Sequence, residues 1–108
     1  FVLPSHTEGL SLALLEAMSC GGRCLVSDIP ANTVITGRYG AEFEAENVDS
    51  LAAALSKEVT TPKDEVLLKQ EMEYVKENFD YDAVIEWHED VYKCALNRKN
   101  EKRWEQNC

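Results

Sequence analysis

Apolar and polar residues alternate in blocks along the chain, and each block has the length of one secondary-structure element. Phe1–Leu3 is an apolar run that ends at Pro4, as expected of a buried strand. Ser11–Cys20 is rich in Leu and Ala and is followed by two glycines, which predicts a helix with a glycine stop. Arg23–Asp28 (RCLVSD) predicts a second short buried strand.

The alternation continues with shorter elements. Ala31–Ile35 predicts a helical turn, and Ala41–Glu44 predicts a short edge strand. Asn47 is a favourable N-cap for a helix over Val48–Val59. Strands that alternate with helices predict a parallel sheet with helices on its faces.

Two longer helices are predicted after a break at Thr60-Thr61-Pro62. The first covers Lys63–Asn78, with an apolar face formed by Leu68, Met72, Val75 and Phe79. The second is capped by Asp80 and runs from Tyr81 to about Arg98. We expect it to bury Val84, Ile85, His88, Val91, Tyr92 and Ala95.

Composition narrows the class of protein. The chain has 108 residues, 44% of them hydrophobic and 29% charged, which is ordinary for one small globular domain. Its net charge of -9 argues against nucleic-acid binding, which needs a basic face. No apolar run reaches the roughly 18 residues of a membrane span. Cys20 and Cys24 lack a second Cys or His pair at zinc-site spacing, so we expect buried thiols in a reducing, cytoplasmic compartment and no metal site.

Two glutamates stand out near the start of the first predicted helix. Glu8 lies in the loop before it and Glu16 lies inside it, with seven residues between them. Ligands of open α/β sheets bind at such strand-to-helix turns, and the free N–H groups of Leu10, Ser11 and Leu12 would suit a phosphate. Glu16 would lie about 7–8 Å further along the axis, where it suits ribose hydroxyls. The arrangement fits a nucleotide-sugar, with the sugar at Glu8.

A solvated surface position is the commoner role of a single glutamate in a helix, so spacing alone leaves both interpretations open. This helix is apolar on nearly every side, through Leu10, Leu12, Ala13, Leu14, Leu15, Ala17 and Met18. Such a helix is expected to be buried, and a buried carboxylate needs a partner. The expected burial favours the ligand-binding interpretation without excluding the other.

The segment PSHTEGLSLALLEAMSCGG, followed by LVSDIPA, resembles a motif of the retaining glycosyltransferases with the GT-B fold (the glycosyl transferases group 1 family), whose donors are nucleotide-activated sugars. The matching positions are Pro4, Ser5, Glu8, Gly9, Glu16, Ala17, Met18, Cys20, Gly21 and Asp28. AEFEAENVDSLAAAL is similar to a later strand and helix start of the family, and Phe79–Tyr92 to its closing helix. The family usually has Pro at the position of Arg23 and often Glu at that of Thr33, so we leave the loop after Asp28 out of the predicted site.

The resemblance implies a fold and a site. The fold would be a partial Rossmann-like parallel sheet with flanking helices, the second half of a GT-B C-terminal domain. Glu8 would contact the donor sugar near the reacting carbon as the catalytic residue, and Glu16 would bind the ribose. Sugar hydroxyls and phosphate would be held by the backbone amides of Gly9, Leu10, Ser11 and Leu12. The donor would be UDP- or GDP-linked, and the reaction would need neither a metal nor a cofactor.

The resemblance also implies a domain organisation, with residues 1–96 as the distal part of the nucleotide-sugar-binding domain and residues 97–108 as a charged C-terminal tail. The chain begins at Phe1 without an initiator Met or a signal-peptide pattern, so we expect a piece of a larger protein. The family's N-terminal acceptor domain, and a basic Arg/Lys pair that neutralises the donor diphosphate, have no counterpart in these 108 residues. We therefore expect the piece alone to be inactive and to self-associate through an unpaired sheet edge.

These features predict a hexosyltransferase-type enzyme that moves a sugar from a nucleotide diphosphate onto a hydroxyl acceptor, with retention, in glycan or cell-surface polysaccharide synthesis. A GT-B sugar-nucleotide epimerase would use the same donor site, and a non-catalytic α/β interaction domain would keep only the scaffold. Both remain alternatives.

Other candidate residues carry less weight. Ser5, Thr7 and Ser11 lack the G-x-S-x-G elbow of a hydrolase nucleophile. His6 is more typical of a polar surface than of a ligand contact, and His88 of a packed helix. The tail sets basic residues beside Trp104, which suits peripheral contact with an anionic membrane surface at its cytoplasmic face, although a solvated helix end is the commoner meaning.

Overall fold

The computed structural model describes residues 1–100, with side chains up to residue 97. The chain divides into two compact units, Phe1–Lys76 and Glu77–Cys108, and each is described by itself. The predicted tail contact at Trp104 lies outside the described residues.

The first unit is built on a three-stranded parallel sheet in the order β1-β2-β3. The strands are β1 (Val2–Leu3), β2 (Leu25–Ser27) and β3 (Ala41–Phe43). Val2 pairs with Leu25, which in turn pairs with Ala41 on the other side. The central strand β2 is buried along its whole length. The structure therefore confirms the predicted parallel sheet, with β3 at one edge.

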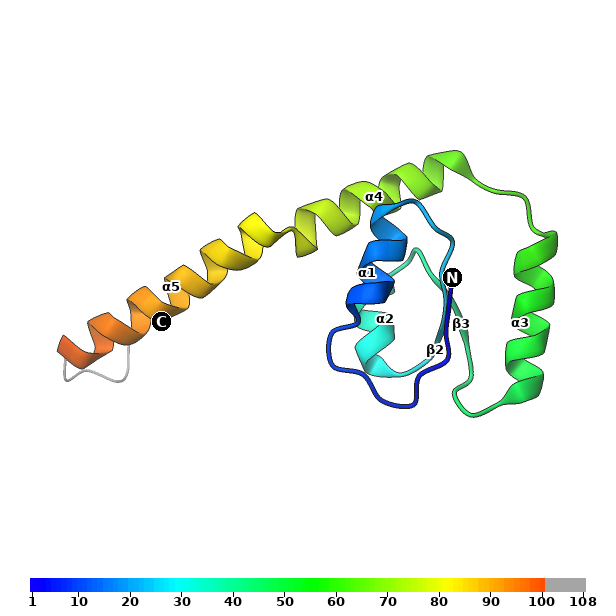
Figure 1. Ribbon diagram of the computed structural model, residues 1–108, viewed down its shortest axis with the longest axis horizontal. Helices are drawn as coiled ribbons and strands as arrows, with labels where there is room; N and C mark the ends of the chain where they lie inside the picture. The colour runs from blue at the N-terminus through cyan, green and yellow to red at the C-terminus, as the bar shows by residue number, and fades with distance from the viewer. Residues whose placement is uncertain (101–108) are drawn as a thin grey trace. The chain divides into compact units, whose positions relative to one another are not determined.

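Three helices cover the two faces of this sheet. They are α1 (Leu12–Ser19), α2 (Pro30–Thr36) and α3 (Val48–Thr60). Figure 1 shows α1 and α2 on one face of the strands and α3 on the other. Each helix follows a strand, so the carboxyl ends of all three strands lead into loops at one end of the sheet. This layered arrangement is the predicted Rossmann-like fold.

Short polar and glycine signals set the helix ends. The Ser11 hydroxyl accepts a hydrogen bond from the Leu14 N–H at 3.3 Å and caps α1. Gly21 ends the same helix with a positive φ of 69°, which glycine adopts without strain. Asn47 caps α3 by accepting from the Ser50 N–H at 2.9 Å, as predicted.

The hydrophobic core lies between the central strand and its flanking helices. Its buried apolar residues are Leu14, Met18, Cys24, Leu25, Val26, Ile35, Phe43 and Val75. The expected burial of the whole α1 helix is wrong, because Leu12, Ala13 and Glu16 are exposed. An eight-residue helix that packs on one face of a small sheet buries one side only. Cys20, on the outer side, is exposed as well, against expectation.

Two helices complete the described chain, α4 (Glu65–Phe79) and α5 (Tyr81–Asn100). The first begins two residues later than predicted, because Asp64 Oδ1 accepts the N–H groups of Val66 and Leu67 and so acts as its cap. Neither this pair nor any other helix within residues 1–100 is long and apolar enough to cross a membrane.

The predicted burial along α5 is wrong. Val84 is half-buried, while the exposed positions are Ile85, His88, Val91, Tyr92 and Ala95. Among the described residues of the second unit there is no second layer against which this helix packs. The apolar pattern of α5 therefore indicates residues that could be buried against a neighbour, but it does not show that a neighbour is present.

Gly22 provides a test of the packing after α1. A Cβ at this position would lie 2.8 Å from the carbonyl oxygen of Ala17, a backbone atom held in the helix. We expect Gly22→Ala to lower the free energy of unfolding by about 2 kcal/mol, measured by urea denaturation. Gly9→Ala is the matched control, because nothing lies within 4 Å of its added Cβ. Equal stability of the two variants would contradict the tight contact.

Candidate functional site

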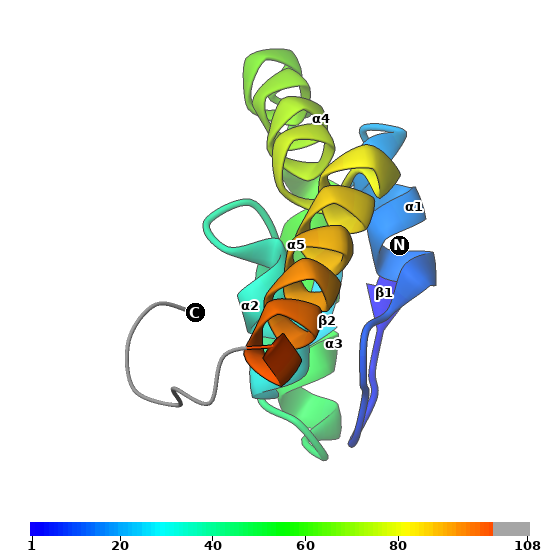
Figure 2. The ribbon, with the colours of Figure 1, turned by 90° about the vertical axis from the view of Figure 1, so that its left-hand side faces the viewer.

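The loop between β1 and α1 forms the centre of the predicted site. Figure 2 shows β1 turning back at its end into the loop that leads to α1. Gly9, Leu10 and Leu12 are exposed, while Ser11 is buried as the cap. Within the described chain, the backbone N–H groups of Gly9, Leu10 and Ser11 have no hydrogen-bond partner. These amides and the positive end of the helix dipole are open to an anion.

Glu8 is held by a series of hydrogen bonds that reaches into the core. The Ser5 hydroxyl donates to Glu8 Oε1 at 2.6 Å. The Ser27 hydroxyl donates to the Ser5 carbonyl oxygen at 2.6 Å, and Asn32 Nδ2 donates to Ser27 Oγ at 3.0 Å. Ser27 and Asn32 are fully buried. The Glu8 loop is thereby fixed to β2 and α2.

Sequence reasoning missed Ser27 and Asn32, and it considered Ser5 as a motif position and as an unsupported nucleophile but not as a partner of Glu8. One signal was available: Ser27 is a polar residue in an otherwise apolar buried strand, and a buried hydroxyl needs a hydrogen-bond partner. The partner itself could not be inferred, because Ser5 lies 22 residues earlier in the chain.

Glu16 lies in the middle of α1 and is exposed. Its carboxylate has no hydrogen-bond or ion-pair partner within the part of the chain that the structure describes. It lies four positions after Leu12, which corresponds to about 6 Å along the helix axis. Because Glu16 is not buried, its role rests on position and not on a need for a partner.

Two neighbouring side chains make contacts of their own. His6 Nδ1 lies 3.0 Å from Glu46 Oε1, and both side chains are exposed. Asp28 Oδ1 accepts the Ala45 N–H at 2.9 Å and so fastens the loop after β3. The motif aspartate thus has a structural partner in this chain. Among the described residues no three His, Cys, Asp or Glu side chains come together as metal ligands.

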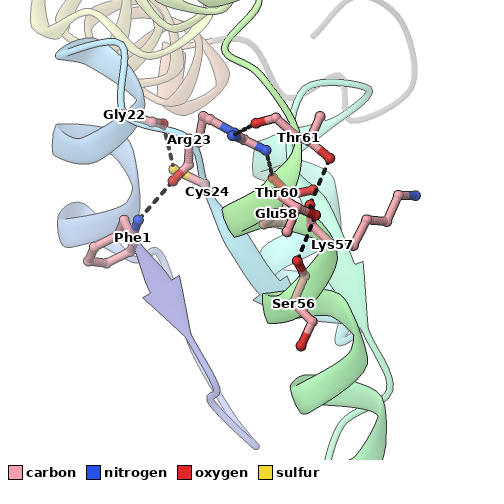
Figure 3. Close-up of polar contacts among 9 residues, drawn as sticks. All are labelled: Phe1, Gly22, Arg23, Cys24, Ser56, Lys57, Glu58, Thr60 and Thr61. Carbon is pink, nitrogen blue, oxygen red and sulfur yellow. Dashed lines mark hydrogen bonds and ion pairs between the residues drawn. The ribbon is translucent and has the colours of Figure 1, made fainter.

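Arg23 lies away from this loop, at the amino end of β2. Its guanidinium donates to the Thr61 carbonyl oxygen at 2.7 Å and pairs with Glu58. Figure 3 shows this side chain reaching to the last turn of α3, while the Phe1 amino group donates to the Arg23 carbonyl oxygen. Arg23 is therefore engaged elsewhere and does not supply positive charge to the Glu8 loop.

Comparison with known proteins relates the chain to sugar transferases. It is 44% identical over 57 residues to UDP-Gal:alpha-D-GlcNAc-diphosphoundecaprenol alpha-1,3-galactosyltransferase of Escherichia coli, covering 51% of this chain and 15% of that protein. It is 38% identical over 53 residues to O-antigen chain mannosyltransferase B of Escherichia coli, covering 49% of this chain and 14% of that protein. The chain thus spans about one seventh of the length of these relatives.

The fold is similar to that of a solved enzyme. Sucrose-phosphate synthase from Thermosynechococcus elongatus superposes with a TM-score of 0.77 at 26% identity, over 89% of this chain and 25% of that one. The profile of the family described as Glycosyl transferases group 1 matches residues 1–60, more than half of the 108 residues. The chain therefore belongs to the glycosyl transferases group 1 family.

Proposed function

We propose that the chain is the distal part of the donor-binding domain of a retaining glycosyltransferase. The enzyme moves a hexose from a UDP- or GDP-linked donor onto a hydroxyl acceptor, in glycan or cell-surface polysaccharide synthesis. One observation carries the proposal: open amides at the start of α1 lie in the same loop as Glu8, which the buried side chains of Ser27 and Asn32 help to fix.

Each part of the donor meets a different part of this loop and helix. The diphosphate lies against the N–H groups of residues 9–12, where the helix dipole favours negative charge. The ribose hydroxyls reach Glu16, which is exposed and free to accept their hydrogen bonds. The sugar lies at Glu8, whose carboxylate stabilises the positive charge that develops at the reacting carbon.

The names of the relatives support a hexose donor. One is named for UDP-Gal and a diphosphoundecaprenol-linked acceptor, and the other for mannose in O-antigen chains. Both matches cover about half of this chain, so the choice between galactose and mannose and the nature of the acceptor are left to experiment.

Electrostatics explains why the 108 residues alone are expected to be inactive. A helix N-terminus carries about half a positive charge, against roughly two negative charges on a nucleotide diphosphate. Glu8, Glu16 and Glu46 lie around the site, and the chain as a whole has a net charge of -9. The donor therefore needs positive groups from elsewhere in a longer enzyme.

The test is nucleotide release by the full-length protein with UDP- and GDP-hexoses. A glycosyltransferase releases nucleotide in proportion to acceptor and forms a product with the donor's anomeric configuration. An epimerase would convert the sugar nucleotide without any acceptor, and a non-catalytic interaction domain would do neither. Either of those two results would contradict the proposal.

The hydrogen bonds behind Glu8 lead to a prediction of their own. Ser27→Ala removes the hydroxyl that donates to the Ser5 carbonyl oxygen, so the Glu8 carboxylate loses its fixed position. We expect kcat of the full-length enzyme to fall about tenfold, with the donor KM nearly unchanged, because misplacement affects the reacting geometry more than binding. Ser27→Thr keeps the hydroxyl and should recover much of the activity. An increase in KM alone would contradict the positioning role.

A further inference from the structure

A cavity of about 220 Å³ opens at the end of the sheet opposite to the Glu8 loop. Its wall includes residues at the starts of β2 and β3, the end of α3 and the first half of α4. A single buried water needs only about 10–15 Å³ on the same measure. The space is therefore large enough for a small organic molecule.

Glu71 is the unusual residue in this wall. Its side chain is 2% exposed and lines the cavity. The carboxyl oxygen Oε1 is buried, and no hydrogen-bond partner for it exists among the described residues. Burying a carboxylate without a partner costs several kcal/mol. An ionised Glu71 is therefore destabilised in the described chain unless a partner from outside it is bound.

The other polar groups in the wall already have partners. The Arg23 guanidinium is bound to Glu58 and to the Thr61 carbonyl oxygen. Asp64 Oδ1 accepts two N–H groups as the cap of α4. No donor of the described chain is hydrogen-bonded to Glu71 Oε1.

The charge and the apolar surface of the wall indicate which kind of small molecule could donate a hydrogen bond to Glu71. Three carboxyl groups line the cavity (Glu58, Asp64 and Glu71) against one guanidinium, so the wall favours a cation. Leu67, Leu68 and the ring of Tyr39 add apolar surface. A compact cation with N–H donors and a short apolar body matches both features.

We propose that this cavity is a binding site for a small primary ammonium ion, which donates its N–H groups to the Glu71 carboxylate and packs its carbon chain against Leu67 and Leu68. The site is separate from the proposed donor site and does not depend on the proposed function.

The protonation states around the cavity fit this ligand. Burial raises the pKa of Glu71 to about 7, so the group can ionise at neutral pH once a cation is beside it. Burial, and then the neighbouring Glu71, raises the pKa of the Cys24 thiol to about 11, so the thiol stays neutral and does not compete for the cation.

The test titrates n-propylammonium chloride into the full-length protein at pH 8, followed by calorimetry. The free energy of binding of a ligand of this size is roughly 4 kcal/mol at best, which corresponds to a Kd of about 1 mM. We expect saturable binding in this range, weakened at least tenfold by Glu71→Gln. Glu73→Gln, an exposed glutamate on the same helix, should leave the affinity unchanged.

Two further arms separate the contributions. Tetramethylammonium carries the charge without an N–H donor, and 1-propanol carries a donor without the charge, so both should bind at least tenfold more weakly. At pH 6, where a pKa of about 7 leaves Glu71 mostly protonated, the 13C resonance of the Glu71 carboxyl in the wild-type protein should move toward its ionised value as n-propylammonium is added, which needs no variant. A binding curve that does not saturate, an affinity of Glu71→Gln equal to that of the wild type, or a Glu71 carboxyl resonance that does not move would each overturn the proposal.

Discussion

Replacing Glu8 with Ala in the full-length enzyme should lower kcat by roughly 10²–10³-fold, the usual cost of removing one group that stabilises developing charge. The carboxylate lies in the loop before α1 and is fixed by the Ser5 hydroxyl at 2.6 Å. In the proposed role it acts only as positive charge builds up at the sugar carbon, so the donor KM should change little. Steady-state kinetics with saturating acceptor gives both constants.

Glu16→Ala is the matched comparison, because the two glutamates are proposed to act on different parts of the donor. The loss of charged hydrogen bonds to the ribose should weaken donor binding by about 1–3 kcal/mol and leave kcat less affected. Glu42→Ala, an exposed glutamate on β3, is the control for a simple change of charge. Small and equal effects of Glu8→Ala and Glu16→Ala would refute the division of roles.

Glu71→Gln should raise the free energy of unfolding at pH 8 by about 3 kcal/mol, the second large effect expected. Burial raises the pKa of Glu71 from 4.5 to about 7, and a difference of one pKa unit is worth about 1.4 kcal/mol. The unfolded chain therefore ionises first, and wild-type stability falls as the pH rises from about 4.5 to 7. The neutral Gln cannot ionise, so the variant avoids this loss.

The measurement compares urea unfolding of the wild type and the variant between pH 4 and pH 8, without added amines. Their stabilities should be nearly equal at pH 4, where Glu71 is protonated in both states, and should separate above pH 5. Glu73→Gln serves as the control, because an exposed glutamate shows no such divergence. A constant difference between wild type and Glu71→Gln at all pH values would show that ionisation is not the cause.

The sequence predicted the order of strands and helices because local signals define each element. Gly21 stops α1, Asn47 caps α3, and the strand LVS begins with two apolar residues, the second of them the β-branched Val. Such signals act over a few residues and can be recognised without the tertiary structure. The loop that carries Glu8 was located for the same reason, since it lies between one such strand and one such helix.

Burial was harder to predict because it depends on how many layers cover an element. The apolar residues of α1 and α5 are able to be buried, yet α1 buries only Leu14 and Met18, and none of the described side chains of α5 is buried. Glu71 shows the opposite case, a buried residue that no sequence pattern marks. It lies in the stretch KQEMEY, yet its side chain is buried in the folded chain, beside residues that are distant in sequence.

The support behind Glu8 was unpredictable because its parts come from three separate segments. Ser5 and Ser27 are 22 residues apart, and Asn32 lies in the next helix. A hydrogen bond of this kind appears only after the sheet has aligned the strands. The motif therefore indicates Glu8 as the proposed catalytic residue but does not indicate the groups that orient it.

Because the groups that support Glu8 lie outside the motif, the motif alone does not carry the whole site. A designer who grafts the segment EGLSLALLEAM onto another parallel sheet would copy both glutamates and the helix start. The graft would leave behind the hydroxyl of Ser27 and the amide of Asn32, which lie under the loop. The smallest portable unit is then the loop and helix together with the adjoining strand β2 and helix α2, residues 4–36.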